Sequence, residues 1–152
     1  MVRRLMLLIS VVVTLCGFVS VSDQMQEQLK TLPQHYSNFD VKMAWNVKTI
    51  GGNTIIEGII QNVRYAIMDD IKIKIALVDA NGKMIRQATD FIIPRQLALN
   101  DTSPFSVKLP AVAPRGAKLV FTYRYMGFDG GGGRDGGPGG LDWMQSFESK
   151  PF

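Results

Sequence analysis

The residues that could carry chemistry are few, and their spacing assembles no catalytic or metal-binding motif. The chain has one histidine, His35, and one cysteine, Cys16, whereas zinc and copper sites need clustered histidine and cysteine ligands. The strained Gly-x-Ser-x-Gly turn of acyl hydrolases does not occur. Glu57 and Asp90 are carboxylates that an enzyme could use, but nothing in their spacing pairs them. We therefore predict no catalytic residue, no metal ligand and no cofactor, and we expect that the protein is not an enzyme.

Two weaker groupings could bind cations. Asp69 and Asp70 could join Asp79 or Asn81 around calcium, but calcium takes six to eight oxygen ligands and no spaced acidic loop is present. The eight methionines are dispersed singly, which favours core filling over copper binding. Solvated turn residues and core side chains are therefore the preferred interpretations.

The charge balance argues against nucleic acid as a partner. The formal net charge is +4, and Arg3 and Arg4 belong to a segment that we expect to be removed. The remaining chain is close to neutral, while an electrostatic nucleic-acid binder needs a basic face. The other basic side chains that could share a sheet surface are interpreted as a solubilising strand face, and they are Lys42, Lys48, Lys72, Lys74 and Arg86.

Residues 1–22 have the three parts of a secretory signal peptide. A short basic start is followed by an apolar stretch, Leu5–Leu15, and then by the small-x-small pattern Ser20-Val21-Ser22, which predicts a mature start at Asp23. We expect export by general secretion to the periplasm or the extracellular space. The alternative is an uncleaved N-terminal anchor, because the apolar run from Leu5 to Val21 is at the short limit for a spanning helix of about 20 residues.

The pattern that follows predicts an all-β domain. Residues 23–38 are a polar lead-in, either a short helix ending before Pro33 or a disordered segment. Alternation of apolar and polar residues then predicts six or seven strands between turn signals, and the clearest lie at 39–47, 54–61, 71–79, 83–92, 105–109 and 119–125. This spacing is typical of a single immunoglobulin-like antiparallel β-sandwich over residues 39–127, and a small barrel is the alternative.

The order of these cues supports a resemblance. A strand with Gly58 followed by Asn62, the turn Asn81-Gly82-Lys83, the strand Phe105–Leu109 and the closing strand Phe121–Tyr125 together resemble the FxLYD-type family of bacterial envelope domains. The resemblance implies a sandwich related to immunoglobulin and fibronectin III domains, used as an accessory or interaction module. The usual glycine before the Phe105 strand is replaced here by Asn100-Asp101, so the loop at that point is expected to differ.

The C-terminal tail is the least ordinary part of the sequence. A glycine-rich stretch, 128–140, is typical of a flexible linker, and it is followed by an aromatic segment, 141–152. This segment could fold back onto the sandwich, for instance as an extra strand. Alternatively, Trp143 and Phe147, with Met144, could dock into a partner as tethered anchors.

These observations favour a non-catalytic exported interaction module of the cell envelope. The expected partner is another envelope protein, with membrane contact only if the N-terminal segment stays uncleaved. The alternative is a periplasmic carrier of a small ligand or metal, with a groove near Trp45, Tyr65 or the strand of Tyr123 and Tyr125.

Overall fold

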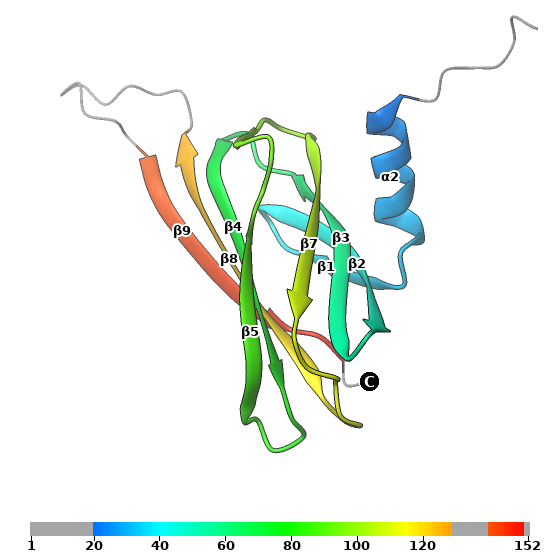
Figure 1. Cartoon of the computed structure of the whole chain (residues 1–152). Helices are drawn as coiled ribbons and strands as arrows, with labels where there is room; N and C mark the ends of the chain where they lie inside the picture. Colours follow the sequence, from blue (N-terminus) through cyan, green and yellow to red (C-terminus); the bar gives the residue numbers. More distant parts are fainter. Residues whose placement is uncertain (1–19, 129–139, 151–152) are drawn as a thin grey trace, which may run out of the picture.

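The structure, a computed structural model, describes residues 20–128 and 140–150. Within them, two antiparallel sheets pack face to face and one short helix lies beside them (Figure 1). The helix and strands are α2 (Val21–Thr31), β1 (Gln34–Ser37), β2 (Val41–Ile50), β3 (Asn53–Asn62), β4 (Ile67–Val78), β5 (Met84–Phe91), β6 (Gln96–Leu97), β7 (Thr102–Leu109), β8 (Lys118–Phe128) and β9 (Gly140–Glu148). The predicted all-β sandwich is therefore confirmed.

The two sheets have different strand orders and share one core. One sheet runs β1-β2-β3-β7, and the other runs β5-β4-β8-β9 with β6 paired to β4. Strand β8 shows why these residues form strands. Leu119, Phe121, Tyr123 and Tyr125 are buried, and the residues between them face outward. Such period-two burial places one face of each strand in the core.

The sandwich is larger than the range 39–127 that the sequence predicted. Strand β1 pairs with β2 before that range begins, and β9 pairs with β8 after it ends. The predicted linker, 128–140, is too wide at both ends, because β8 continues to Phe128 and β9 begins at Gly140. Residues 129–139 lie outside the described part, as do 1–19 of the predicted leader and 151–152.

The lead-in contains a helix rather than a disordered segment. Ser20 caps α2, because its side chain accepts a hydrogen bond of 3.1 Å from the backbone N–H of Asp23. The helix ends before Pro33, as predicted. It lies against the outer face of the sheet formed by β1, β2, β3 and β7 (Figure 1), where Ala44 and Ile59 are buried. None of its own side chains is buried. No helix of the described residues is long and apolar enough to cross a membrane.

The Gly58 and Asn62 pair of the resemblance has a structural explanation. A Cβ atom on Gly58 would lie 2.4 Å from the Ala44 carbonyl oxygen and 2.5 Å from Cζ of Phe105. Only glycine therefore lets the Phe105 ring pack under β3. The buried side chain of Asn62 donates hydrogen bonds of 2.9 Å to the carbonyl oxygens of Ala66 and Leu97. These contacts tie β3 to the β3–β4 connection and to β6.

The loop before β7, where the sequence has Asn100-Asp101, adopts a turn conformation. Asn100 has a φ of 68°, a left-handed conformation that asparagine tolerates better than most residues with a Cβ. Asp101 closes this turn, because its Oδ2 accepts a hydrogen bond of 2.8 Å from the Ala98 N–H. Asn100 thus takes up a backbone geometry that otherwise favours glycine.

Candidate functional site

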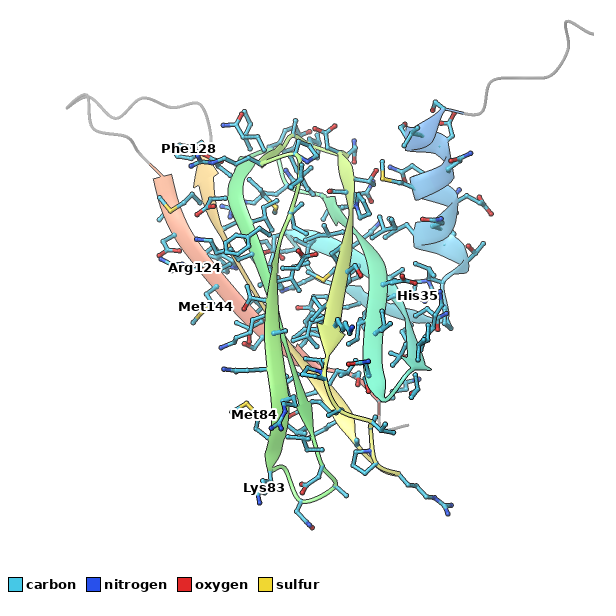
Figure 2. All side chains as sticks on the ribbon, in the orientation of Figure 1. His35, Lys83, Met84, Arg124, Phe128 and Met144 are labelled. Carbon is cyan, nitrogen blue, oxygen red and sulfur yellow. The ribbon has the colours of Figure 1, made fainter. Side chains whose placement is uncertain are left out.

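The three predicted docking residues all lie on β9 but face different surroundings. Of the two alternatives for this segment, the structure shows the fold-back one, since β9 pairs with β8 along its whole length. Phe147 stacks on Tyr36 with ring centroids 3.6 Å apart and on Phe121 at 4.8 Å. Met144 points away on the opposite face and is 66% exposed (Figure 2). Phe147 is thus packed against the core of the sandwich. A docking role for Trp143, Met144 and Phe147 stays a prediction.

Trp143 takes part in an aromatic–cation cluster. Its ring meets Phe39 edge-on, with centroids 5.3 Å apart. The guanidinium carbon of Arg64 lies 5.8 Å from the Phe39 ring centroid and 6.0 Å from that of Trp143, within the range of cation–π attraction. Arg64 is thus held beside two aromatic rings from distant parts of the chain. The neighbouring Tyr65 is 91% exposed.

A buried polar network lies beneath this cluster. Asp40 is fully buried, and its Oδ1 accepts a hydrogen bond of 2.8 Å from the hydroxyl of Tyr123. Its Oδ2 accepts one of 3.1 Å from the hydroxyl of Tyr125. Arg64 Nη1 in turn donates to the Tyr125 hydroxyl at 3.4 Å. The network therefore links the partly buried guanidinium of Arg64 to the core, and it fixes the orientation of the arginine.

Burial sets the protonation state of the two phenols. It raises the pKa of Tyr123 far above its ordinary value, with a further contribution from the hydrogen bond to Asp40. Burial also raises the pKa of Tyr125 to about 12, against an opposing contribution from Arg64. Both hydroxyls therefore remain donors at neutral pH. This arrangement holds side chains in place and offers no free acid–base pair, because both oxygens of Asp40 are occupied.

The sequence pattern placed Asp40 on the wrong face. Alternation from Phe39 predicted an apolar Phe39 in the core and a solvated Asp40, whereas Phe39 is 55% exposed and Asp40 is buried. The chain bends at these two residues before β2 begins, and the bend changes the phase of the alternation. The usable signal was Tyr123 and Tyr125 on one buried face, because buried tyrosine hydroxyls usually have a partner.

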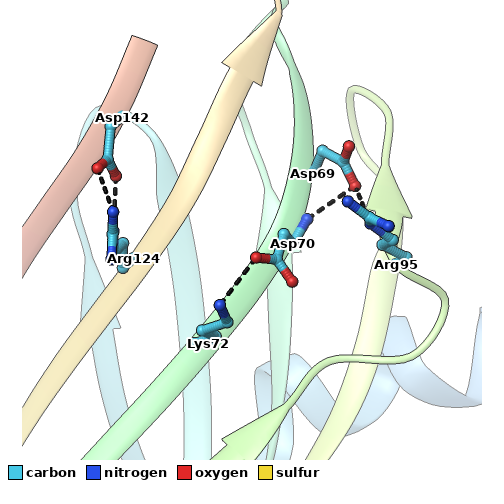
Figure 3. A network of polar contacts seen from close by, with 6 residues as sticks. All are labelled: Asp69, Asp70, Lys72, Arg95, Arg124 and Asp142. Carbon is cyan, nitrogen blue, oxygen red and sulfur yellow. Dashed lines mark hydrogen bonds and ion pairs between the residues drawn. The ribbon is translucent and has the colours of Figure 1, made fainter. Parts of the chain in front are cut away.

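Several charged residues on the outer face of the sheet formed by β5, β4, β8 and β9 are paired (Figure 3). Asp69 accepts from Arg95 at 2.9 Å, and Asp70 accepts from Lys72 at 2.8 Å. Arg124 of β8 pairs with Asp142 of β9.

Two of these ion pairs lower the pKa of their carboxyl groups. Lys72 lowers the pKa of Asp70, and Arg124 lowers that of Asp142. The carboxylate of Asp79 accepts from the N–H groups of Asn81 and Lys83 in its own turn. In the described residues no three His, Cys, Asp or Glu side chains gather into a cation site.

The predicted basic surface is divided between two sheets. Lys72, Lys74 and Arg86 belong to the sheet of β4 and β5, while Lys42 and Lys48 lie on β2 of the other sheet. His35 lies on the short strand β1, where it is exposed (Figure 2). These side chains therefore form no single site.

Glu57 and Asp90, the carboxylates considered for catalysis, line one groove. The groove has a volume of about 580 Å³ and lies between α2, the outer face of β2, β3 and β7, and the end of β5. Glu57 is paired with Lys48 at 2.7 Å. Asp90 accepts a hydrogen bond of 2.9 Å from the N–H of Ser106. Each carboxylate thus already has a partner in the protein.

The residues suggested for a ligand groove do not lie in one cavity. Trp45, Tyr123 and Tyr125 are buried in the core, while Tyr65 stands in solvent. The groove between α2 and β5 involves none of them.

No protein-family model matches the sequence, and a search of the curated proteins finds no match. Among solved structures, the chain is similar to the ApaA protein from Bordetella pertussis, with 11% identity, a TM-score of 0.48, and coverage of 78% of this chain and 96% of that one. It is also similar to the C-terminal domain of Wzt (12% identity, TM-score 0.45, 89% and 84% coverage). A third is the GAE domain of GGA2p from Saccharomyces cerevisiae (9% identity, TM-score 0.44, 76% and 96% coverage). At these scores the likenesses say nothing about function.

Proposed function

We propose that the protein is a non-catalytic, exported interaction module of the cell envelope, of the kind that the FxLYD-type resemblance implies. The observation that carries this proposal is Arg64, held beside Phe39 and Trp143 and next to the exposed Tyr65. We refer to these four residues as the Arg64 cluster. Their proposed partner is another envelope protein.

The composition of the Arg64 cluster supports binding to a protein. Tryptophan, tyrosine and arginine are the residue types that dominate binding energy in protein interfaces. Within the described residues the guanidinium of Arg64 donates only to the hydroxyl of Tyr125, so it has donors left for a partner. The network beneath it reduces the entropy that Arg64 would lose on binding.

The test uses Tyr65, because a side chain so exposed can be replaced without loss of fold. A photoreactive phenylalanine analogue at position 65 is expected to crosslink one envelope protein in the native host. The same analogue at Met84, an exposed residue of β5, serves as the control and should not crosslink that protein.

The crosslinked partner is then purified and its affinity measured. Tyr65→Ala and Arg64→Ala are expected to raise the Kd about tenfold or more, as for interface hot spots, and Met84→Ala less than twofold. Equal crosslinking from positions 65 and 84, or unchanged affinity of both cluster variants, would contradict the proposal.

The proposed export and cellular location are tested separately from binding. An intact-mass spectrum of the protein expressed in a bacterial host is expected to begin at Asp23, with the protein in the periplasmic or culture fraction. A full-length mass in the membrane fraction would instead make the chain an anchored module.

The groove between α2 and β5 supports a second function, that of a carrier for a small ligand. Its volume of about 580 Å³ lies in the range of ligand pockets. Native mass spectrometry of protein purified from its own host would show a bound mass under this alternative. An unliganded mass would count against it.

A further inference from the structure

Strand β9 is the open edge of the sandwich. It is nine residues long and lies at the edge of its sheet, beside β8 (Figure 1). The backbone N–H of Ser149 donates to the carbonyl oxygen of Leu119, and this pair continues the register in which Phe147 faces Phe121. Odd-numbered residues of β9 therefore bond to β8. The even-numbered residues from Gly140 to Glu148 turn their N–H and C=O groups outward.

The other long edges carry features that block strand pairing. On β7 the outward position 104 is a proline, which has no N–H, and the N–H of Ser106 is bonded to the Asp90 side chain. On β5 Asp90 also accepts from the N–H of Phe91, and Arg86 donates to the carbonyl oxygen of Ile85. Proline and side-chain caps are how natural sheets prevent edge-to-edge association. The fourth edge, β1, is only four residues long.

Strand β9 has none of these features in the part of the chain that the structure describes. It contains no proline and no lysine, and no described residue bonds to its outward backbone groups. Its two acidic side chains could guard the edge, but both are turned toward β8. Asp142 pairs with Arg124 (Figure 3), and Glu148 pairs with Lys118.

We propose that β9 pairs antiparallel with β9 of a second copy of this chain, so that the two sheets become continuous across a twofold axis at Met144. Met144 is the central residue of the strand, so this register pairs every residue of β9 and matches outward groups with outward groups. Asp142 then lies opposite Ser146 of the second copy, and Glu148 opposite Gly140, so no like charges meet.

Exposed apolar side chains favour the same register. Met144, 66% exposed, lies opposite the second copy's Met144, and Leu141, 63% exposed, lies opposite the second copy's Phe147. Both apolar side chains are covered by pairing. A twofold arrangement of this kind is closed, so it stops at the dimer.

The first test separates backbone pairing from side-chain loss. The N–H of Met144 points away from β8, so Met144→Pro removes an outward donor and leaves the β8–β9 bonds in place. Met144→Ala, the matched control, keeps the N–H. By sedimentation equilibrium at micromolar concentrations, the wild type and Met144→Ala are expected to be dimers and Met144→Pro a folded monomer. A monomeric wild type, or a Met144→Pro variant that dimerises as well as the wild type, would overturn the proposal.

The second test does not depend on how well the proline variant folds. In a Cys16→Ser background, Met144→Cys places two thiols across the axis with Cα atoms about 5.5 Å apart, which suits a disulfide. Oxidation is expected to give a covalent dimer in high yield. Ser146→Cys, whose two copies are offset by about 14 Å along the strands, and Met84→Cys on β5 should remain monomeric. Crosslinking of Ser146→Cys in place of Met144→Cys would overturn the proposed register.

Discussion

The N-terminal helix α2 and the C-terminal strand β9 both lie outside the predicted sandwich, yet they are attached in different ways. Strand β9 bonds to β8 along its length and places Phe147 between two aromatic rings. Helix α2 rests on an outer sheet face and buries none of its own side chains. The backbone ladder and aromatic stacking make β9 an integral part of the core, whereas α2 is an appendage. We expect the two segments to respond very differently to substitution.

The largest expected effect concerns Phe147. Phe147→Ala removes the ring that joins Tyr36 to Phe121, and Phe→Ala substitutions in cores cost about 3–5 kcal/mol. Because Phe147 is half-buried, we expect a loss of unfolding free energy of about 3 kcal/mol in chemical denaturation. Leu32→Ala, next to α2, is the matched control and is expected to cost less than about 1 kcal/mol. Similar losses for both variants would remove the distinction between core strand and appended helix.

A somewhat smaller effect is expected at Asp40, which supports the region beneath Trp143. Asp40→Ala leaves the hydroxyls of Tyr123 and Tyr125 without their acceptor, and an unsatisfied buried polar group costs about 1–3 kcal/mol. We expect a loss of about 2 kcal/mol in the same denaturation assay. Asp40→Asn keeps one acceptor oxygen and should lie between the wild type and Asp40→Ala. An Asp40→Ala variant as stable as the wild type would show that the network contributes no stability.

A third effect is local to α2. Ser20→Ala removes the helix cap, which is worth about 1 kcal/mol. In the uncleaved full-length chain, which still contains Ser20, hydrogen exchange of the α2 amides is expected to accelerate while that of β8 and β9 stays unchanged. In the wild type, α2 should already exchange faster than β9, because its opening does not require the core to open. Exchange of α2 and β9 at one common rate would mean that the two segments unfold together.

The effect that is smallest at neutral pH concerns the two buried tyrosines, because it develops only in alkaline solution. The pKa of Tyr125 is raised to about 12, and that of Tyr123 is also raised, whereas an unfolded tyrosine titrates near 10. The folded state thus favours the protonated phenols, so their contribution to stability is fully present below pH 10 and declines as the pH rises from about 10 to 12. Denaturation measured across this range should show a steep decline in the wild type and a shallower one in Tyr125→Phe. Identical slopes would contradict the role assigned to burial.

The sequence predicted the regular strands better than the segments at the two ends. Strands such as β7 and β8 follow a clear period of two, because one face of each is buried along its length. Strand β1 has only four residues, Gln34–Ser37, too few for a period to be recognised. In strand β9 the alternation is interrupted, because the apolar Met144 follows Trp143 and the polar Gln145 lies on the same face as Trp143 and Phe147. The preceding glycines also indicated a linker, so the pairing of this segment stayed one of two alternatives.

The Arg64 cluster was even less accessible to sequence reasoning. It joins the bend at Phe39, the β3–β4 connection and Trp143 of β9, and no local pattern reports contacts between such distant segments. Trp143 was selected as an aromatic anchor, whereas Arg64 was not. The groove between α2 and β5 was missed for the same reason, although its two carboxylates, Glu57 and Asp90, had been considered as catalytic groups.

The close contact between Gly58 and Phe105 also restricts the routes by which this sequence can change over evolutionary time. A side chain at position 58 would collide with the ring at position 105 and with the carbonyl oxygen of Ala44, so it is harmful while the phenylalanine remains. A smaller residue at position 105 would relieve one of these collisions. The collision with the Ala44 carbonyl oxygen would remain, because it belongs to the backbone of the neighbouring strand. Gly58 is therefore expected to persist even in lineages that replace Phe105.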